Sequence, residues 1–209
     1  MRLFLLLLLS YSILSCSDQA NSDGYTAYFG GEIDNPQGSF VYIKDSNGKY
    51  DTIPLNSENR FMYKINDLVP GLYEFGHGGE IQVVVLEPQD SLAFRLNTRD
   101  FDESLAFTGK GAKKNNYLMR LFLEHENNRD KLLKLFRKEP EDFQSSLDSI
   151  MQTELAELKK FSDDRNHSDL FRSISKSIVE YNYYYYKEIY PFGYYGYRPC
   201  KIRRDLNCL

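Results

Sequence analysis

The chain has 209 residues, of which 42% are hydrophobic and 27% are charged, a composition that allows an ordinary globular core. Its formal net charge is −4, and this becomes −5 when the first 15 residues, which hold one Arg and no acidic residue, are set aside. Binding to nucleic acid needs a basic surface that neutralises phosphates, so we expect no nucleic-acid partner.

The first 15 residues have the pattern of a secretory signal peptide. Arg2 precedes the apolar run Leu3–Leu9, which is shorter than the about 20 residues that a membrane-spanning helix needs. Ile13-Leu14-Ser15-Cys16 resembles the lipobox of bacterial lipoproteins, which implies cleavage before Cys16 and acylation of that residue. The alternative is ordinary cleavage with Cys16 unmodified. Residues 16–24 are small and polar, and we expect them to form a flexible, lipidated tether to the membrane.

Residues 25–111 have the alternating pattern of half-buried strands. In Arg60–Ile65, for example, Phe61, Tyr63 and Ile65 share one face. Turn signals such as Asn47-Gly48 separate the runs roughly every eight to twelve residues, a spacing that is typical of a β-sandwich or barrel. The predicted strands are Tyr25–Ile33, Ser39–Lys44, Tyr50–Leu55, Arg60–Ile65, Leu72–Phe75, Ile81–Glu87, Ser91–Leu96 and Leu105–Thr108.

Two of these runs, Phe40–Ile43 and Val83–Leu86, are apolar on both faces, which indicates central strands. The predicted fold class is therefore α+β: an antiparallel β-sandwich of about eight strands, followed by a four-helix C-terminal segment.

Residues 112–192 change to a helical period of about 3.6 residues. The first helix opens at Asn115, the second is centred on 130–138, and the third begins at Pro140. Asn166 or Ser168 caps the fourth, which Pro191 and Gly193 should stop. Its expected inward stripe consists of Leu170, Ile174, Ile178, Tyr181, Tyr185 and Ile189. Residues 193–209 lack periodicity and are predicted to form a disordered or aberrant tail.

Nine tyrosines lie between Tyr181 and Tyr197. Tyr183–Tyr186 are consecutive, so they point around the whole circumference of a helix at about 100° per residue. Three interpretations follow: a helix wedged between two layers, a docking surface for a partner protein or an absent downstream domain, and an aromatic sugar-binding platform. The candidate docking residues are Tyr183, Tyr184, Tyr186, Tyr190, Tyr194 and Tyr195.

The residues that carry chemistry in other proteins form no convincing set here. The three histidines have no metal-ligand spacing, and His77 is predicted to be a turn residue. Asp45–Gly48 indicates a hairpin turn because a calcium loop would need a Glu at its twelfth position. Asp100, Asp102 and Glu103 indicate a solvated loop, and Cys200 with Cys208 could form a disulfide. We therefore predict no catalytic, cofactor or metal-binding residues.

Several motifs occur in an order that resembles one known family. Glu87–Leu92 reads Glu-Pro-Gln-Asp-Ser-Leu, and Gly109-Lys110-Gly111 is followed by Asn115–Leu118, which reads Asn-Asn-Tyr-Leu. Together with Tyr28–Ile33 and Pro70–Tyr73, they resemble Bacteroidota lipoproteins in which a β-sandwich of unknown function and a helical segment precede a thioredoxin-like domain of the TlpA type. The resemblance covers about residues 25–190.

This resemblance implies an exported, outer-membrane lipoprotein that faces the periplasm or the cell surface, and a truncated form of a longer protein. The chain stops where the thioredoxin-like domain would begin and has no Cys-x-x-Cys motif, so the redox activity of the family does not carry over. The expected function is a non-catalytic spacer or docking unit. The alternative is a ligand- or glycan-binding sandwich with an aromatic groove on one sheet face. An enzyme is disfavoured because no nucleophile–base or metal set is present.

Overall fold

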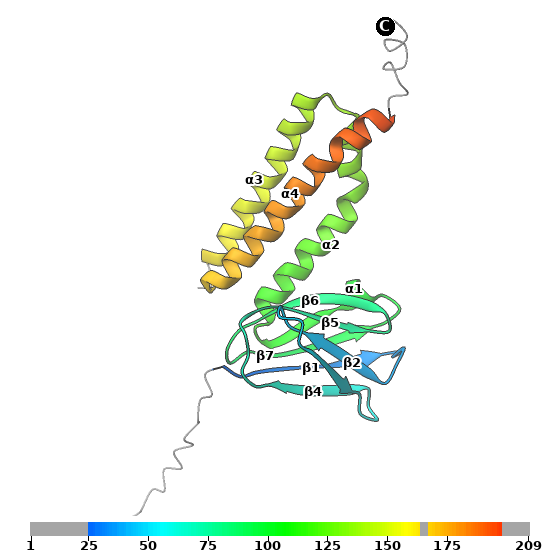
Figure 1. The fold of residues 1–209 in the computed structure, drawn as a ribbon, viewed down its shortest axis with the longest axis vertical. Helices are drawn as coiled ribbons and strands as arrows, with labels where there is room; N and C mark the ends of the chain where they lie inside the picture. Colours follow the sequence, from blue (N-terminus) through cyan, green and yellow to red (C-terminus); the bar gives the residue numbers. More distant parts are fainter. Residues whose placement is uncertain (1–24, 164–166, 198–209) are drawn as a thin grey trace, which may run out of the picture.

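A computed structural model describes residues 25–163 and 167–197, which form a two-sheet β-sandwich and a helical arm that extends away from it (Figure 1). The predicted α+β class is confirmed, with eight strands and four helices in the described residues. Cys16, Cys200 and Cys208 lie outside them, as do the predicted signal peptide, the tether and residues 198–209. No helix within the described ranges combines the length and the apolar content that crossing a membrane requires.

The strands pair into two four-stranded sheets. Sheet A has the order β4-β1-β7-β8, and sheet B has the order β3-β2-β5-β6. The strand bounds all lie within two residues of those predicted from alternation and turns. They are β1 (Ala27–Asp34), β2 (Phe40–Lys44), β3 (Tyr50–Pro54), β4 (Arg60–Ile65), β5 (Gly71–His77), β6 (Glu80–Leu86), β7 (Ser91–Asn97) and β8 (Ala106–Lys110).

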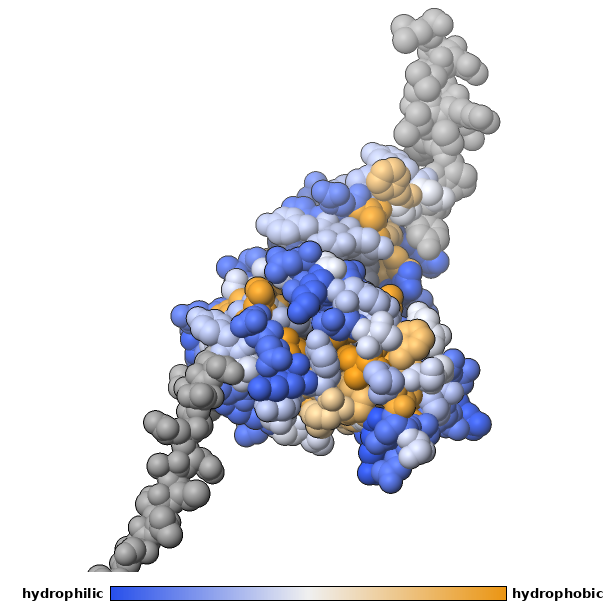
Figure 2. All heavy atoms as spheres, turned by 60° about the horizontal axis from the view of Figure 1, so that its bottom comes forward, coloured by the Kyte–Doolittle hydropathy of each residue, from blue (hydrophilic) through white to orange (hydrophobic). Residues whose placement is uncertain are grey.

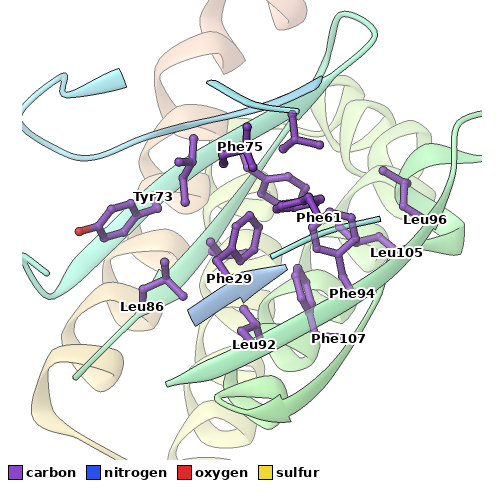
Figure 3. Packing of buried hydrophobic residues seen from close by; sticks show 14 of the residues in the cluster. Phe29, Phe61, Tyr73, Phe75, Leu86, Leu92, Phe94, Leu96, Leu105 and Phe107 are labelled. Atoms are coloured by element: carbon purple, nitrogen blue, oxygen red, sulfur yellow. The ribbon is translucent and has the colours of Figure 1, made fainter. Parts of the chain in front are cut away.

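Phenylalanine rings from both sheets fill the space between them (Figure 3). The ring of Phe29 on β1 lies 5.3 Å from Phe75 on β5 and 5.5 Å from Phe94 on β7, measured between centroids. Rings at these separations gain stabilisation beyond their buried area. The alternating residues of each strand therefore supply the core, as their pattern predicts.

Three details of the sandwich differ from the sequence predictions. The pair β1–β7 is parallel, so the sandwich is not purely antiparallel. β6 is an edge strand and not a central one; its outer face is apolar because Val85 is buried beneath the helices. His77, which was predicted to be a turn residue, is the buried last residue of β5. Its Nε2 accepts the N–H of Gln37 (2.9 Å), and its Nδ1 lies 2.8 Å from the carbonyl oxygen of Phe40.

The helical arm consists of α2 (Ala112–Lys134), a short 3₁₀ turn η1 (Leu135–Arg137), α3 (Pro140–Asp163) and α4 (Asp169–Tyr197). The first two predicted helices are thus one continuous helix, α2. A further short helix, α1 (Phe101–Ser104), occupies the predicted loop at Asp100–Glu103. At the start of α4, Ser168 accepts the N–H of Phe171 (3.0 Å), as expected of a capping residue.

Two consecutive asparagines join α2 to the free edges of both sheets. The side chain of Asn115 accepts the N–H of Val85 (2.7 Å) on β6 and donates to its carbonyl oxygen (3.0 Å). Asn116 accepts the N–H of Phe107 (2.9 Å) on β8 and donates to its carbonyl oxygen (2.9 Å). Each amide therefore completes the backbone hydrogen bonds that an edge strand leaves open.

A buried ion-pair cluster lies beside this joint. The Nζ of Lys114 is 2.6 Å from a carboxylate oxygen of Glu87 and 2.6 Å from one of Asp90. The side chains of Lys114 and Asp90 are only 6% and 5% exposed. Burial is the largest influence on both carboxyl groups, and it acts to raise their pKa values. For Asp90 burial prevails over the opposing effect of Lys114, so the pKa is raised. For Glu87, hydrogen bonds from Lys114 and Ser168 and nearby positive charge outweigh burial, so the pKa is lowered. Lys114, together with the motif residues Glu87, Asp90, Asn115 and Asn116, thus fixes the arm to the sandwich.

Candidate docking surface on the last helix

The last helix continues through both residues that were predicted to stop it. Pro191 and Gly193 lie inside α4, which ends at Tyr197. The reason is tertiary packing on both sides of the proline: Tyr190 packs against Phe136 of η1, and a side chain on Gly193 would collide with the same ring. These contacts hold the chain helical where local preference alone would end it.

Four of the six candidate docking tyrosines pack inward, between α4 and the elements around it. Tyr190 is 8% exposed, stacks on Phe143 at 3.9 Å between centroids, and donates its hydroxyl to the carbonyl oxygen of Lys138. Tyr183 donates to Asp148 (2.8 Å) and Tyr194 to Glu139 (2.7 Å). Tyr186 is partly buried in the same cluster, and this burial raises its pKa. For these four residues the structure matches the interpretation of a helix wedged between layers.

The other two candidates, Tyr184 and Tyr195, point away from the arm and belong to a larger exposed set. We call this set the aromatic stripe; its members and exposed fractions are Tyr181 (70%), Tyr184 (59%), Tyr185 (45%), Phe192 (81%) and Tyr195 (61%). Figure 2 shows apolar side chains at the surface of this end of the arm, beside the grey C-terminal residues. The stripe is thus an exposed, largely aromatic face on a helix whose other side is packed against the arm.

Sequence reasoning placed Tyr181 and Tyr185 on the inward stripe, and this assignment is wrong. The buried face of α4 is centred instead on Phe171, Ser175 and Val179, which are at most 1% exposed. The prediction followed the largest apolar residues and overlooked Ser175, whose small side chain lets the helix approach its neighbours. Counting the helical phase from Ser175 would have placed Tyr181, Tyr184 and Phe192 outside.

The remaining candidate residues are separated in space. His125 lies between the three long helices. Its Nε2 is 2.8 Å from a carboxylate oxygen of Glu154, and its Nδ1 is 2.5 Å from the side-chain nitrogen of Asn182. His167 is elsewhere and stacks on Phe161. Asp102 accepts a hydrogen bond from Gln82 (2.9 Å). No group of histidine, cysteine and carboxylate side chains suited to a metal ion occurs within 25–163 and 167–197.

The outer face of sheet B carries a second, smaller aromatic surface. Tyr42 and Tyr50 stack with their centroids 5.2 Å apart, and the half-exposed ring of Phe40 lies on the same face. Gly76 leaves room for the ring of Tyr42 to lie close against the β5 backbone. Burial and the hydrogen-bonded Glu74 raise the pKa of Tyr42 to about 12, so its hydroxyl stays protonated at neutral pH. We call Phe40, Tyr42 and Tyr50 the sheet platform.

Comparison with known proteins identifies no relative. No family model, curated protein or solved structure matches the chain.

Proposed function

We propose that the chain is a lipid-anchored lipoprotein of the cell envelope that acts as a non-catalytic spacer and docking unit. The observation that carries this proposal is the aromatic stripe, since five large aromatic side chains exposed on one helix face are typical of an interaction surface. The lipobox-like sequence at Cys16 and the motif order that resembles TlpA-type lipoproteins support the membrane anchor and the envelope location.

The architecture suits a spacer. The described chain enters the sandwich at residue 25, and the stripe lies at the far end of the helical arm (Figure 1). The 29 residues of α4 alone span about 43 Å at 1.5 Å per residue. Because Asn115, Asn116 and Lys114 join α2 firmly to the sandwich, an anchor at Cys16 would hold the stripe at a distance from the membrane.

Photo-crosslinking in cells that produce the protein tests the docking role. A benzoylphenylalanine placed at Phe192 should give a discrete crosslinked species in the membrane fraction, because this side chain is the most exposed of the stripe. The same probe at Lys159, an exposed position on α3, is the matched control and should give none. Absence of an adduct at Phe192, or equal adducts at both positions, would contradict the docking role.

Fractionation of the same cells tests the lipid anchor. With Cys16→Ser the protein should leave the membrane fraction, because the thiol that carries the acyl chains is gone. If the Cys16→Ser protein stays in the membrane fraction with unchanged mass, the lipid anchor is wrong, whatever the crosslinks show.

A glycan-binding role is a second candidate, favoured by the sheet platform. Sugar rings pack on exposed aromatic faces, and Lys44 and Glu74, which form a 3.3 Å ion pair beside Tyr42, offer polar partners for hydroxyl groups. On a glycan array the protein should then give hits that Tyr50→Ala removes and that Tyr184→Ser leaves unchanged. An array without hits would count against this role.

A further inference from the structure

The aromatic stripe has the spacing of a helix–helix seam. From Tyr181, the exposed face continues at Tyr184, Glu188, Phe192 and Tyr195, in steps of three, four, four and three residues. Steps of three and four keep side chains on one face of a helix and are the spacing by which two helices pack along each other.

These positions are also symmetric about Glu188. Tyr181 and Tyr195 each lie seven residues from it, and Tyr184 and Phe192 each lie four residues from it. A two-fold axis through Glu188, perpendicular to the helix, would place Tyr181 of one copy opposite Tyr195 of the other, and Tyr184 opposite Phe192. Such an antiparallel contact is self-complementary, as a two-fold interface must be.

The area of the stripe is sufficient for a pair. Aromatic side chains bury about 200 Å² each, so the exposed fractions of the five residues leave roughly 600 Å² on each copy and about 1,200 Å² in a dimer. This value lies at the lower end of stable protein interfaces. The symmetry also sets Tyr197, the end of α4, opposite Val179. The α4 helix of the second copy therefore ends ten residues short of Asp169, where α4 of the first copy begins.

We propose that the occupant of the aromatic stripe is a second copy of this chain, packed antiparallel through the C-terminal half of α4. This inference rests on the docking role proposed above and names its partner. The central pair of Glu188 side chains is the one unfavourable element, because it brings two carboxylates together.

Sedimentation of the purified full chain in a non-ionic detergent tests this assembly. The chain should follow a monomer–dimer equilibrium, and the double variant Tyr184→Ser/Phe192→Ser should weaken the dimer about 100-fold or more because both aromatic contacts are lost on both copies. Glu188→Leu should tighten the dimer about tenfold by removing the paired carboxylates. Tyr25→Ser, at a tyrosine that is 62% exposed outside the arm, should change nothing. Thermal unfolding of each variant, measured at a concentration at which all the proteins are monomeric, should stay close to that of the parent, since the changed side chains are exposed.

Cysteine crosslinking tests the orientation in a background in which Cys200 and Cys208 are replaced by Ser. A mixture of the Tyr181→Cys and Tyr195→Cys proteins should form a disulfide-linked dimer, whereas each protein alone should not, because equivalent positions would lie about 20 Å apart. Crosslinks in the single preparations, a chain that is monomeric at every concentration, or open-ended oligomers would overturn the proposal. If the chain is monomeric but Phe192 crosslinks to another protein in cells, the docking role stands and the second copy is excluded. If neither occurs, both proposals fall.

Discussion

Replacing Lys114 by Met should lower the free energy of unfolding by about 3–5 kcal/mol at pH 7, the usual cost of removing one partner from a buried ion pair. The loss is large because Asp90, at 5% exposure, and Glu87, at 18%, would lose the lysine that pairs with both of them. Urea denaturation measures it. Lys113→Met is the matched control: Lys113 is the exposed neighbour on the same helix, and its replacement should change stability by less than about 0.5 kcal/mol.

The defect of Lys114→Met should shrink as the pH falls. Burial raises the pKa of Asp90 and pushes the pKa of Glu87 in the same direction. Without Lys114, this effect is opposed at Asp90 only by the hydrogen bond from the backbone N–H of Glu87, and at Glu87 by Ser168 and His167. A carboxyl group whose pKa is raised in the folded state destabilises the fold above that pKa and ceases to do so once it is protonated. The variant should therefore recover stability relative to the parent between pH 7 and pH 4.5. A defect that is constant over this range, or equal losses for Lys113→Met and Lys114→Met, would show that the ion pair is not the cause.

Asn115→Ala should destabilise the protein by about 2–4 kcal/mol, because it leaves the buried N–H and carbonyl groups of Val85 without partners. Asn116→Ala removes the same two hydrogen bonds from Phe107 but at an exposed position, where water can replace the amide, so about 1 kcal/mol is expected. Chemical denaturation measures both losses. Hydrogen exchange adds a local readout, because the Val85 amide should lose protection in Asn115→Ala and keep it in Asn116→Ala.

These two variants also bear on function. The joint at Asn115 and Lys114 is what couples the sandwich to the arm, so loosening it should leave the aromatic stripe intact while freeing its position relative to the membrane end. If Asn115→Ala were no more harmful than Asn116→Ala, the edge of sheet B would not depend on this amide, and the stiffness that the spacer role needs would have to come from the apolar contacts of Val85, Tyr117 and Phe171.

The resemblance motifs acquire a physical role in the structure. Asp90 of the Glu-Pro-Gln-Asp segment and Lys114 just before the paired asparagines meet in one cluster, although 24 residues separate them in the chain. Sequence reasoning noticed both segments and could not connect them, because a lysine on a helix is normally a solvated side chain. Only the position of α2 against the edge of β6 turns it into a buried one.

The sequence by itself determined the places of the strands and the existence of the helical segment, and it narrowed the cap of α4 to Asn166 or Ser168. These features depend on alternation, turn residues and capping, which follow from backbone geometry over a few neighbouring residues. Only the tertiary structure decided that β1 and β7 run parallel, that β6 lies at an edge, that His77 is buried, and that Pro191 lies within a helix. It also decided which tyrosines face inward: Tyr190 stacks on Phe143, whereas Tyr184 is 59% exposed. A local pattern determines which side chains of a helix or strand share one face. Whether that face is buried depends on residues from distant parts of the chain, so no short segment can specify it.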